Sequence, residues 1–238
     1  MTNKLYLTDS YLNEIQAVVV RSSAREVILD RTIFYPGGGG QPSDTGRMIA
    51  GADAFRVVEV RKEGEEVVHL ADHGTIAAGS VVKCQLDWGR RYAFMRYHSA
   101  IHLLDAVFMD LFKSEGLSSG SQIYEDRARV DFSAESISRS QIETLFDRAN
   151  SLLKEDRIIR SYDLLQEEAL EDGTLARTKP GKELIQKLKV VRIVEIEGLD
   201  RQADGGTHVS RTSEIGTLSF QKLESKGRNN KRVYFSIT

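Results

Sequence analysis

The hydrophobic pattern of this 238-residue chain changes abruptly at Gly89, and this change constrains the fold more than any other feature. Before it lie short runs rich in Val, Ile and Leu, separated by polar or Gly-containing turns: KLYL, EIQAVVV, REVILD, FRVVEV, EVVHLA and SVVKCQL. Short strands at this spacing are typical of a small barrel or sandwich. We therefore expect residues 1–88 to form an N-terminal β-barrel domain.

The segment that follows Gly89 has a helical period instead. Residues 90–115 contain neither Gly nor Pro, and the run stops at Gly116, which predicts one long helix. Apolar residues recur along it at helical spacing: Phe94, Ile101, Leu104, Phe108, Leu111 and Phe112.

The remainder of the chain alternates between both patterns. Ser140 and Glu143 predict a capping box that opens a second helix. The segments QIYEDRARVDF, DRIIRSYD, VVRIVEI and THVSRTSEIG predict strands, and TLSFQKL and RVYFSIT predict a hairpin joined through KGRNN. Residues 89–238 are thus expected to form an α/β domain with a mostly antiparallel sheet, which makes the whole chain α+β.

Composition excludes several classes of protein. The chain lacks an apolar run long enough to span a membrane, and its start lacks the apolar core of a signal peptide, which predicts a cytoplasmic protein without a membrane partner. The single Cys84 excludes a disulfide framework and a multi-cysteine zinc site. A net charge of −2 excludes a polycationic nucleic-acid binder, although residues 177–192 and 222–232 are locally basic and are candidate phosphate contacts.

Histidine spacing indicates where a metal can bind. His98 and His102 are four residues apart in the predicted long helix, so they share a face and can reach one ion. His69 and His73 have the same spacing in a β-rich stretch, where four residues span roughly 13 Å, too far to chelate one ion. The alternative for the helical pair is two partly buried histidines bonded to backbone or carboxylate groups.

The segment Asp204-Gly-Gly-Thr-His208 supplies further candidate ligands. Two successive glycines allow a sharp turn, so that the side chains on either side of them can converge. Carboxylate oxygen and imidazole nitrogen are both zinc ligands. A tight Asp-Gly-Gly hairpin, with His208 leading a strand, remains the alternative.

A second glycine-rich segment, residues 35–46, reads YPGGGGQPSDTG. It has no lysine for a phosphate loop, and Pro42 with its β-type flanks argues against a dinucleotide-binding turn. Four glycines expose backbone N–H groups and permit close approach by a ligand. A mobile loop between strands is the alternative.

Four motifs in this order, FYPGGGGQPSDTG, RYHSAIHLL, GSQIYEDRARVDFS and DGGTHVSRTSEIG, resemble the alanyl-tRNA editing family. This family comprises the editing domain of alanyl-tRNA synthetase and the free-standing AlaX proteins, and the Gly-rich β segment resembles the medium-length AlaX form. The resemblance implies a metal-dependent aminoacyl-tRNA hydrolase, a carboxylic ester hydrolase that acts in trans on tRNA(Ala) mischarged with Ser or Gly. It implies no obligate protein partner.

The resemblance also assigns metal ligands. The family's HxxxH motif falls on His98 and His102, and its Cys-Gly-Gly-Thr-His motif falls on residues 204–208. It thus implies one Zn²⁺ per chain, held by those two histidines with Asp204 and His208. Asp204 stands where the family pattern commonly has cysteine, and a carboxylate binds zinc less tightly than a thiolate.

The Gly-rich motif of the family falls on Gly37, Gly38, Gly39, Gly40 and Gln41, which the resemblance places in the substrate-binding cleft. Thr207 offers a hydroxyl and Gln41 an amide, and we expect both to recognise the small polar aminoacyl group as catalytic residues. Whether the metal activates water or orients the substrate stays open. Two rival functions are a non-catalytic tRNA-binding module that has lost the metal through Asp204, and a hydrolase of another aminoacyl-tRNA or small ester.

Overall fold

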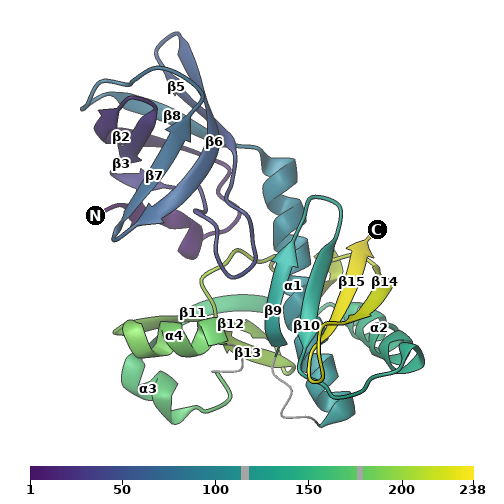
Figure 1. Ribbon diagram of the computed structural model, residues 1–238. Coiled ribbons are helices and arrows are strands. Elements are labelled where there is room, and N and C mark those ends of the chain that lie inside the picture. The colour runs from purple at the N-terminus through teal and green to yellow at the C-terminus, as the bar shows by residue number, and fades with distance from the viewer. Residues whose placement is uncertain (114–117, 176–178) are drawn as a thin grey trace. The chain divides into compact units, whose positions relative to one another are not determined.

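The computed structural model describes residues 1–113, 118–175 and 179–238 (Figure 1). Within them the chain divides into two units, residues 1–94 and 95–238. The first contains a closed antiparallel barrel, and the second combines helices with two antiparallel sheets, so the expected α+β class is confirmed. The division into domains at residues 88 and 89 stays a prediction. In the described part of the chain, no helix is long and apolar enough to cross a membrane.

The barrel joins six strands in the order β2-β3-β7-β6-β5-β8, each antiparallel to its neighbours. Their bounds are β2 Glu14–Ser23, β3 Glu26–Leu29, β5 Gly46–Ala50, β6 Asp53–Glu63, β7 Glu66–Ala71 and β8 Val81–Leu86. Apolar side chains fill the barrel interior, among them Val19, Val27, Leu29, Phe34, Met48, Val57, Val67, Val82 and Cys84. The burial of these apolar side chains favours closure of the sheet. Closure also pairs every strand on both sides, so no strand edge is left unpaired.

Two details of the first unit differ from expectation. The predicted strand KLYL is only a two-residue strand, β1 (Asn3–Lys4), which pairs in parallel with β4 (Arg31–Thr32) and is followed by a 3₁₀ turn at Leu5–Leu7. Strand β5 was missed because it begins with glycine directly after a glycine-rich loop. Gly46 is required there, since a Cβ would lie 2.1 Å from the backbone oxygen of Gln85 on β8.

The second unit contains two antiparallel sheets. One has the order β14-β15-β10-β9 and the other β11-β12-β13. The strands are β9 Ser118–Ile123, β10 Ala128–Phe132, β11 Ile159–Leu165, β12 Val190–Ile196, β13 Asp200–Ala203, β14 Leu218–Ser225 and β15 Lys231–Ile237. The helices are α1 Trp88–Phe112, in which the boundary between the units lies, α2 Arg139–Leu153, α3 Gln166–Glu171 and α4 Lys179–Lys187.

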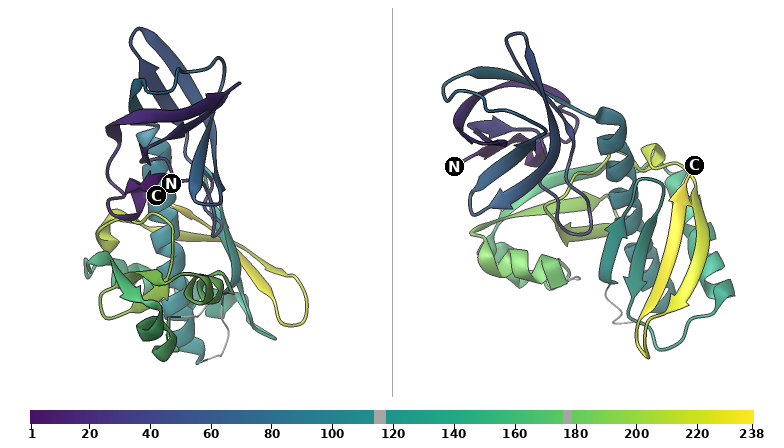
Figure 2. Two further views of the ribbon diagram at one scale, coloured as in Figure 1. Left: turned by 90° about the vertical axis from the view of Figure 1, so that its left-hand side faces the viewer. Right: turned by 45° about the horizontal axis from the view of Figure 1, so that its top comes forward.

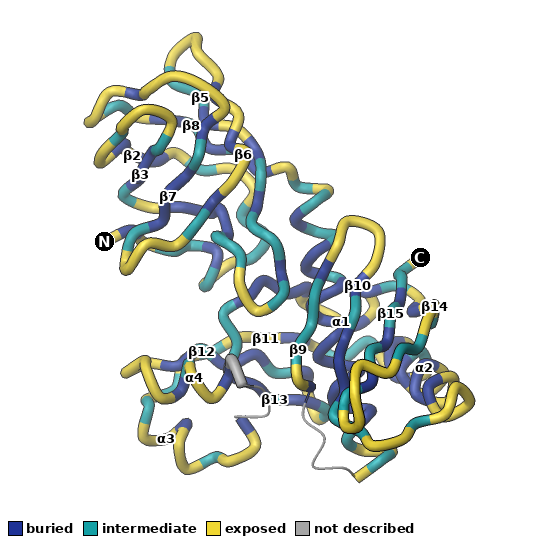
Figure 3. Tube along the Cα trace, viewed as in Figure 1, coloured by how far each residue is buried: buried dark blue, intermediate teal, exposed yellow. Residues whose placement is uncertain are grey.

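Helices α1 and α2 pack on one face of the four-stranded sheet (Figures 1 and 2). The ring of Phe108 on α1 stacks on Phe132 of β10, with centroids 4.1 Å apart, and Phe146 of α2 lies 6.0 Å from Phe235 of β15. Most of α1 within the second unit is buried (Figure 3). Ala100 on this helix is fully buried. A separate apolar cluster joins α3 and α4 to the three-stranded sheet: Ala169, Leu175, Ile185, Val191, Ile193 and Ala203.

The long helix is confirmed as α1, although its predicted end at residues 114–116 lies outside the described residues. Helix α2 begins earlier than predicted, because Ser138 rather than Ser140 is the N-cap. The Ser138 hydroxyl accepts from the backbone N–H of Gln141, whose side chain accepts from the N–H of Ser138. This reciprocal pair satisfies two N–H groups at the helix start.

Two strand predictions in the second unit were wrong in detail. QIYEDRARVDF is not one strand but parts of β9 and β10, which pair with Ala128 opposite Ile123. THVSRTSEIG is an irregular segment with a 3₁₀ turn at Thr212–Glu214. It pairs with the chain at the start of β11 only through an isolated bridge between Ile158 and Arg211. The side chain of Glu214 accepts from the N–H groups of Ser210 and Arg211. The predicted terminal hairpin is confirmed as β14 and β15.

His69 lies in the barrel core and is fully buried. One ring nitrogen, Nδ1, lies 3.0 Å from the carbonyl oxygen of Val27, and Nε2 lies 2.7 Å from the hydroxyl of Thr32. Burial lowers the pKa of His69 to about 4, against the opposing effect of the Val27 bond. The neutral ring therefore fits the barrel and the charged ring does not.

We expect the His69→Gln chain to lose less stability in acid than the wild type. The unfolded chain binds a proton at His69 below pH about 6.5, whereas the folded chain binds it only near pH 4. The contribution of neutral His69 to the free energy of unfolding is therefore complete above pH 6.5 and is lost as the pH falls from 6.5 to 4. Urea unfolding of the metal-free proteins at pH 7.5 and 5.0 should show an extra loss of about 2 kcal/mol for the wild type.

The matched control for this prediction is His73→Gln, because the His73 ring is exposed on the barrel surface beside Asp72. That variant should follow the pH dependence of the wild type. Identical pH dependence in all three proteins would contradict the role of His69.

Candidate metal centre

Helix α1 supplies two imidazoles on one buried face. His98 and His102 are 3% and 5% exposed, and their ring centroids lie 5.3 Å apart. The helical repeat brings residues four apart to the same side, and the packing of α1 in the second unit turns that side inward. The sequence-based expectation of a shared face is met.

The segment directly after β13 brings in the other two donors. The Asp204 carboxylate accepts from the backbone N–H of Gly206 at 2.6 Å, which closes a tight turn. Arg192 on β12 donates one guanidinium nitrogen to the carbonyl oxygens of Asp204 and Gly206, at 3.1 and 3.0 Å. The turn is thus tied to the neighbouring strand, and His208 returns to within reach of Asp204.

Gly206 cannot carry a side chain here. A Cβ at this position would lie 2.2 Å from Cε1 and 2.4 Å from Nδ1 of His98. Contacts this short do not occur, so the missing side chain is what lets the turn approach the His98 ring. The Gly-Gly pair therefore has a steric function besides its freedom to turn.

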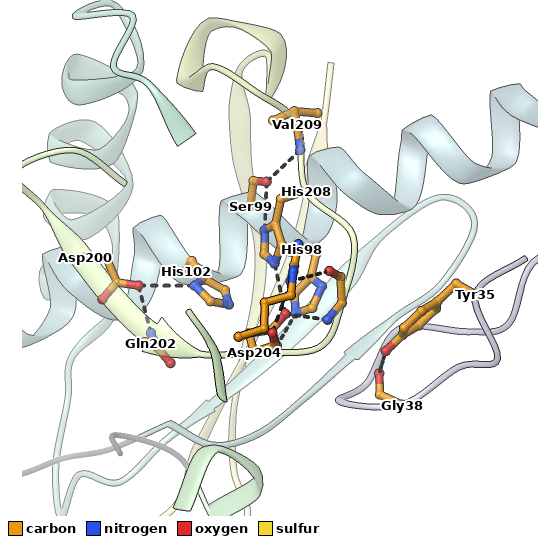
Figure 4. A network of polar contacts seen from close by, with 12 residues as sticks. Tyr35, Gly38, His98, Ser99, His102, Asp200, Gln202, Asp204, His208 and Val209 are labelled. Carbon is orange, nitrogen blue, oxygen red and sulfur yellow. Dashed lines mark hydrogen bonds and ion pairs between the residues drawn. The ribbon is translucent and has the colours of Figure 1, made fainter. Parts of the chain in front are cut away.

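The four side chains converge as Figure 4 shows. One donor atom from each of His98, His102, Asp204 and His208 lies within 4.8 Å of all the others. His208 Nε2 lies 3.1 Å from Asp204 Oδ2, and His98 Nε2 lies 3.6 Å from Oδ1. The structure therefore brings together the ligand set that the sequence predicted, from a helix and a turn about 100 residues apart.

In His102 and His208 the ring nitrogen that points away from the cluster, Nδ1, here called the outer nitrogen, has a hydrogen-bond partner. His102 Nδ1 lies 3.2 Å from Asp200 Oδ2, which also accepts from the Gln202 amide at 3.0 Å. His208 Nδ1 lies 3.1 Å from the hydroxyl of Ser99. Sequence reasoning missed these partners, although the alternation of Asp200 and Gln202 just before the Asp-Gly-Gly turn was a usable signal.

For three of the four residues, His98, His208 and Asp204, the electrostatics of the cluster favour the protonation states that a metal ligand needs. Burial lowers the pKa of His98 to about 4, and burial together with the neighbouring His98 holds the pKa of His208 well below its usual range. Burial opposes ionisation of Asp204, but His98 and the bond to His208 outweigh it and hold its pKa well below its usual range. For His102, Asp200 outweighs burial and raises the pKa.

This donor set fits a divalent cation. Three imidazole nitrogens and one carboxylate oxygen match the number and type of ligands in zinc sites. The carboxylate is ionised, and the outer nitrogens of His102 and His208 face other partners, which leaves their Nε2 atoms directed at the cluster.

The other two histidines lie outside the cluster. His69 is in the barrel core and His73 is exposed, and neither belongs to the donor cluster. Thr207 is fully buried within the ligand turn. Of the basic stretch 222–232, Lys231 donates to the carbonyl oxygens of Gly227 and Arg228.

The Gly-rich segment of the first unit is an ordered turn rather than a free loop. Gly37, Gly38, Gly39 and Gly40 all have positive φ angles, which other residues rarely adopt. Gly38 and Gln41 exchange two backbone hydrogen bonds, of 3.0 and 2.9 Å, and Gln41 is 2% exposed.

The base of this turn is fixed by a buried ion pair. Asp44 accepts from the backbone N–H of Tyr35 and from the guanidinium of Arg91, at the start of α1. Arg91 is 1% exposed and also donates to the carbonyl oxygens of Ser10 and Ile33. Asp44 and Arg91 therefore connect the base of the turn to Tyr35, Ser10 and Ile33, all within the first unit.

Comparison with known proteins identifies the family of the chain. Residues 191–234 match the family described as "Threonyl and Alanyl tRNA synthetase second additional domain", and residues 5–90 match "tRNA synthetases class II (A)". The chain is 39% identical over 240 residues to the alanyl-tRNA editing protein AlaX-M of Saccharolobus solfataricus, covering 100% of this chain and 99% of the relative. It is also 39% identical to AlaX-M of Methanosarcina barkeri, with the same coverage.

A larger relative shows the same relationship. The alanine–tRNA ligase of Ignicoccus hospitalis is 37% identical over 218 residues, which are 91% of this chain and 24% of that enzyme. The resemblance inferred from four sequence motifs is thus confirmed along the whole chain. The chain belongs to the AlaX-M family of alanyl-tRNA editing proteins.

Proposed function

We propose that this protein is a trans-editing hydrolase that removes Ser and Gly from mischarged tRNA(Ala), using one Zn²⁺ held by His98, His102, Asp204 and His208. The observation that carries the proposal is the convergence of these four donors in a chain that matches AlaX-M proteins from end to end. We further propose that it acts in the cytoplasm, where it meets charged tRNA.

The reaction is hydrolysis of the ester between the amino acid and the terminal ribose of the tRNA. Water adds to the ester carbonyl carbon, the bond to the ribose oxygen breaks, and the free amino acid and a tRNA with its hydroxyl restored are released. A bound Zn²⁺ supplies a Lewis acid for this chemistry. His98 and Asp204 provide neutral nitrogen and ionised oxygen for it, because their pKa values lie below neutrality.

Two side chains are proposed to recognise the aminoacyl group. Thr207 lies inside the ligand turn with its hydroxyl fully buried, and Gln41 carries a buried amide at the end of the four glycines. A buried hydrogen-bonding group discriminates strongly between ligands that pair with it and ligands that do not. Gly38 and Gly39 are exposed in that turn and are proposed to permit close approach of the substrate.

For binding of tRNA we propose the basic stretch 177–192, in which Lys182 and Lys189 are exposed. Phosphate contacts of this kind are sequence-independent and weaken with added salt. The stretch 222–232 supports the same role less well, because Arg232 forms a two-point ion pair with Asp131 inside its own unit.

Replacing His98 by alanine should abolish both zinc content and deacylation, since three remaining donors leave a buried site incomplete. Elemental analysis of the purified variant and release of amino acid from Ser-tRNA(Ala), Gly-tRNA(Ala) and correctly charged Ala-tRNA(Ala) check this. The wild type should hydrolyse the first two and spare the third. Stoichiometric zinc in the variant would contradict the ligand assignment, and tRNA binding by a wild type inactive on all charged tRNAs would support a non-catalytic module.

Replacing Asp204 by cysteine should tighten Zn²⁺ binding, by about tenfold or 1.4 kcal/mol, because a thiolate is a softer ligand for zinc than a carboxylate. Competition with a chromogenic chelator measures the affinity. Asp204→Ala is the control and should weaken binding. Unchanged affinity of the Asp204→Ala variant would show that the carboxylate does not bind the metal.

Replacing Gln41 by alanine should lower the rate of Ser-tRNA(Ala) deacylation by about tenfold, the cost of one buried hydrogen bond, without changing the zinc content. Gln16→Ala, an exposed amide on β2, is the matched control and should behave as the wild type. Unchanged deacylation by the Gln41 variant would remove it from the substrate site.

A further inference from the structure

His102 differs from His208 in the partner of its Nδ1 atom. That partner is the carboxylate of Asp200, whose side chain is completely buried. His208 faces the hydroxyl of Ser99, which also accepts from the backbone N–H of Val209. A hydroxyl can donate or accept, so it selects a tautomer only weakly, whereas an ionised carboxylate can only accept.

The position of Asp200 is itself fixed. It opens β13, and the antiparallel pairing of Asp200 with Ile196 holds its backbone on the three-stranded sheet. The Gln202 side chain points to the same side of the strand and donates to Asp200 Oδ2, the oxygen that faces His102. Both groups are buried, with 3% and 4% exposure, so this oxygen has two protein donors in a water-poor setting.

We propose that Asp200 is a positioning residue: its carboxylate accepts a hydrogen bond from the Nδ1–H of His102 and so directs the Nε2 lone pair of that ring at the donor cluster. The proposal rests on the proposed metal centre. Metal-ligating histidines typically donate their second ring N–H to a carboxylate or carbonyl, and this orients the ring and strengthens the ligand. Gln202 in turn orients the carboxylate.

The test uses the full-length chain, stripped of metal and titrated with Zn²⁺ in competition with a chromogenic chelator. Asp200→Asn keeps the shape of the side chain and removes its charge, and should weaken Zn²⁺ binding by about 10- to 100-fold. Gln202→Leu leaves the carboxylate in place and should weaken binding by a smaller factor. The Co²⁺ absorption spectrum of both variants should shift, since it reports the ligand field directly.

A merely structural role is excluded by two comparisons. Asp131→Asn removes another buried carboxylate of the same unit, whose partners are arginines, and should lower the Tm without changing the Zn²⁺ affinity. In a His102→Ala background, Asp200→Asn should cause no further loss of affinity, because its effect passes through His102.

Each outcome decides one claim. Equal affinities of wild type and Asp200→Asn, or an equal loss with and without His102, would overturn the positioning role while leaving the metal centre intact. A wild-type chain that binds no Zn²⁺ would instead overturn the proposed function itself.

Discussion

The donor cluster of the second unit is arranged around one carboxylate, Asp204, that faces three imidazoles. The Asp204 side chain is 16% exposed and lies against His98 and His208, two rings whose burial lowers their pKa, so neither of them supplies a positive charge to match the carboxylate at neutral pH. Burying such a charge is costly unless a counter-charge is present. The turn is nevertheless held rigidly in place, by Arg192 from β12 and by the close approach that Gly206 permits. This is the arrangement expected of a site preorganised for a cation.

Family membership and site geometry support each other through independent observations. The identity to AlaX-M proteins extends over both the barrel and the second unit. The donor cluster, by contrast, is formed only by residues of the second unit. Asp204 is held at the cluster by its own turn, because its carboxylate accepts from the Gly206 N–H. The glycine-rich turn of the first unit, residues 37–41, is held at its base by the ion pair between Arg91 and Asp44, which forms without a ligand.

Much of the fold and of the ligand set could be predicted from the sequence, because their signals are local. Helical spacing placed His98 and His102 on one face, and alternation identified most barrel strands. Strand β5 escaped because it starts at a glycine that packs against the backbone of Gln85, a contact without a sequence pattern. The segment after Thr207 was taken for a strand because side-chain bonding by Glu214 leaves no periodic trace. Asp200 escaped for a related reason, since its partner lies 98 residues away.

The buried alanine at position 100 exposes the protein to the error that it is proposed to correct. If Ser or Gly reaches alanine codons through mischarged tRNA(Ala), some copies of this chain will carry them at Ala100, between the two histidines of α1. Glycine within a helix costs about 1 kcal/mol relative to alanine, and a buried serine adds a hydroxyl that needs a partner. Fewer intact copies would then leave more tRNA(Ala) mischarged. Errors at alanine codons would then reduce the editing activity that limits those errors, so the error rate would rise faster than the initial fault. How readily this happens would depend in part on how much stability the chain loses when the methyl group of Ala100 is replaced.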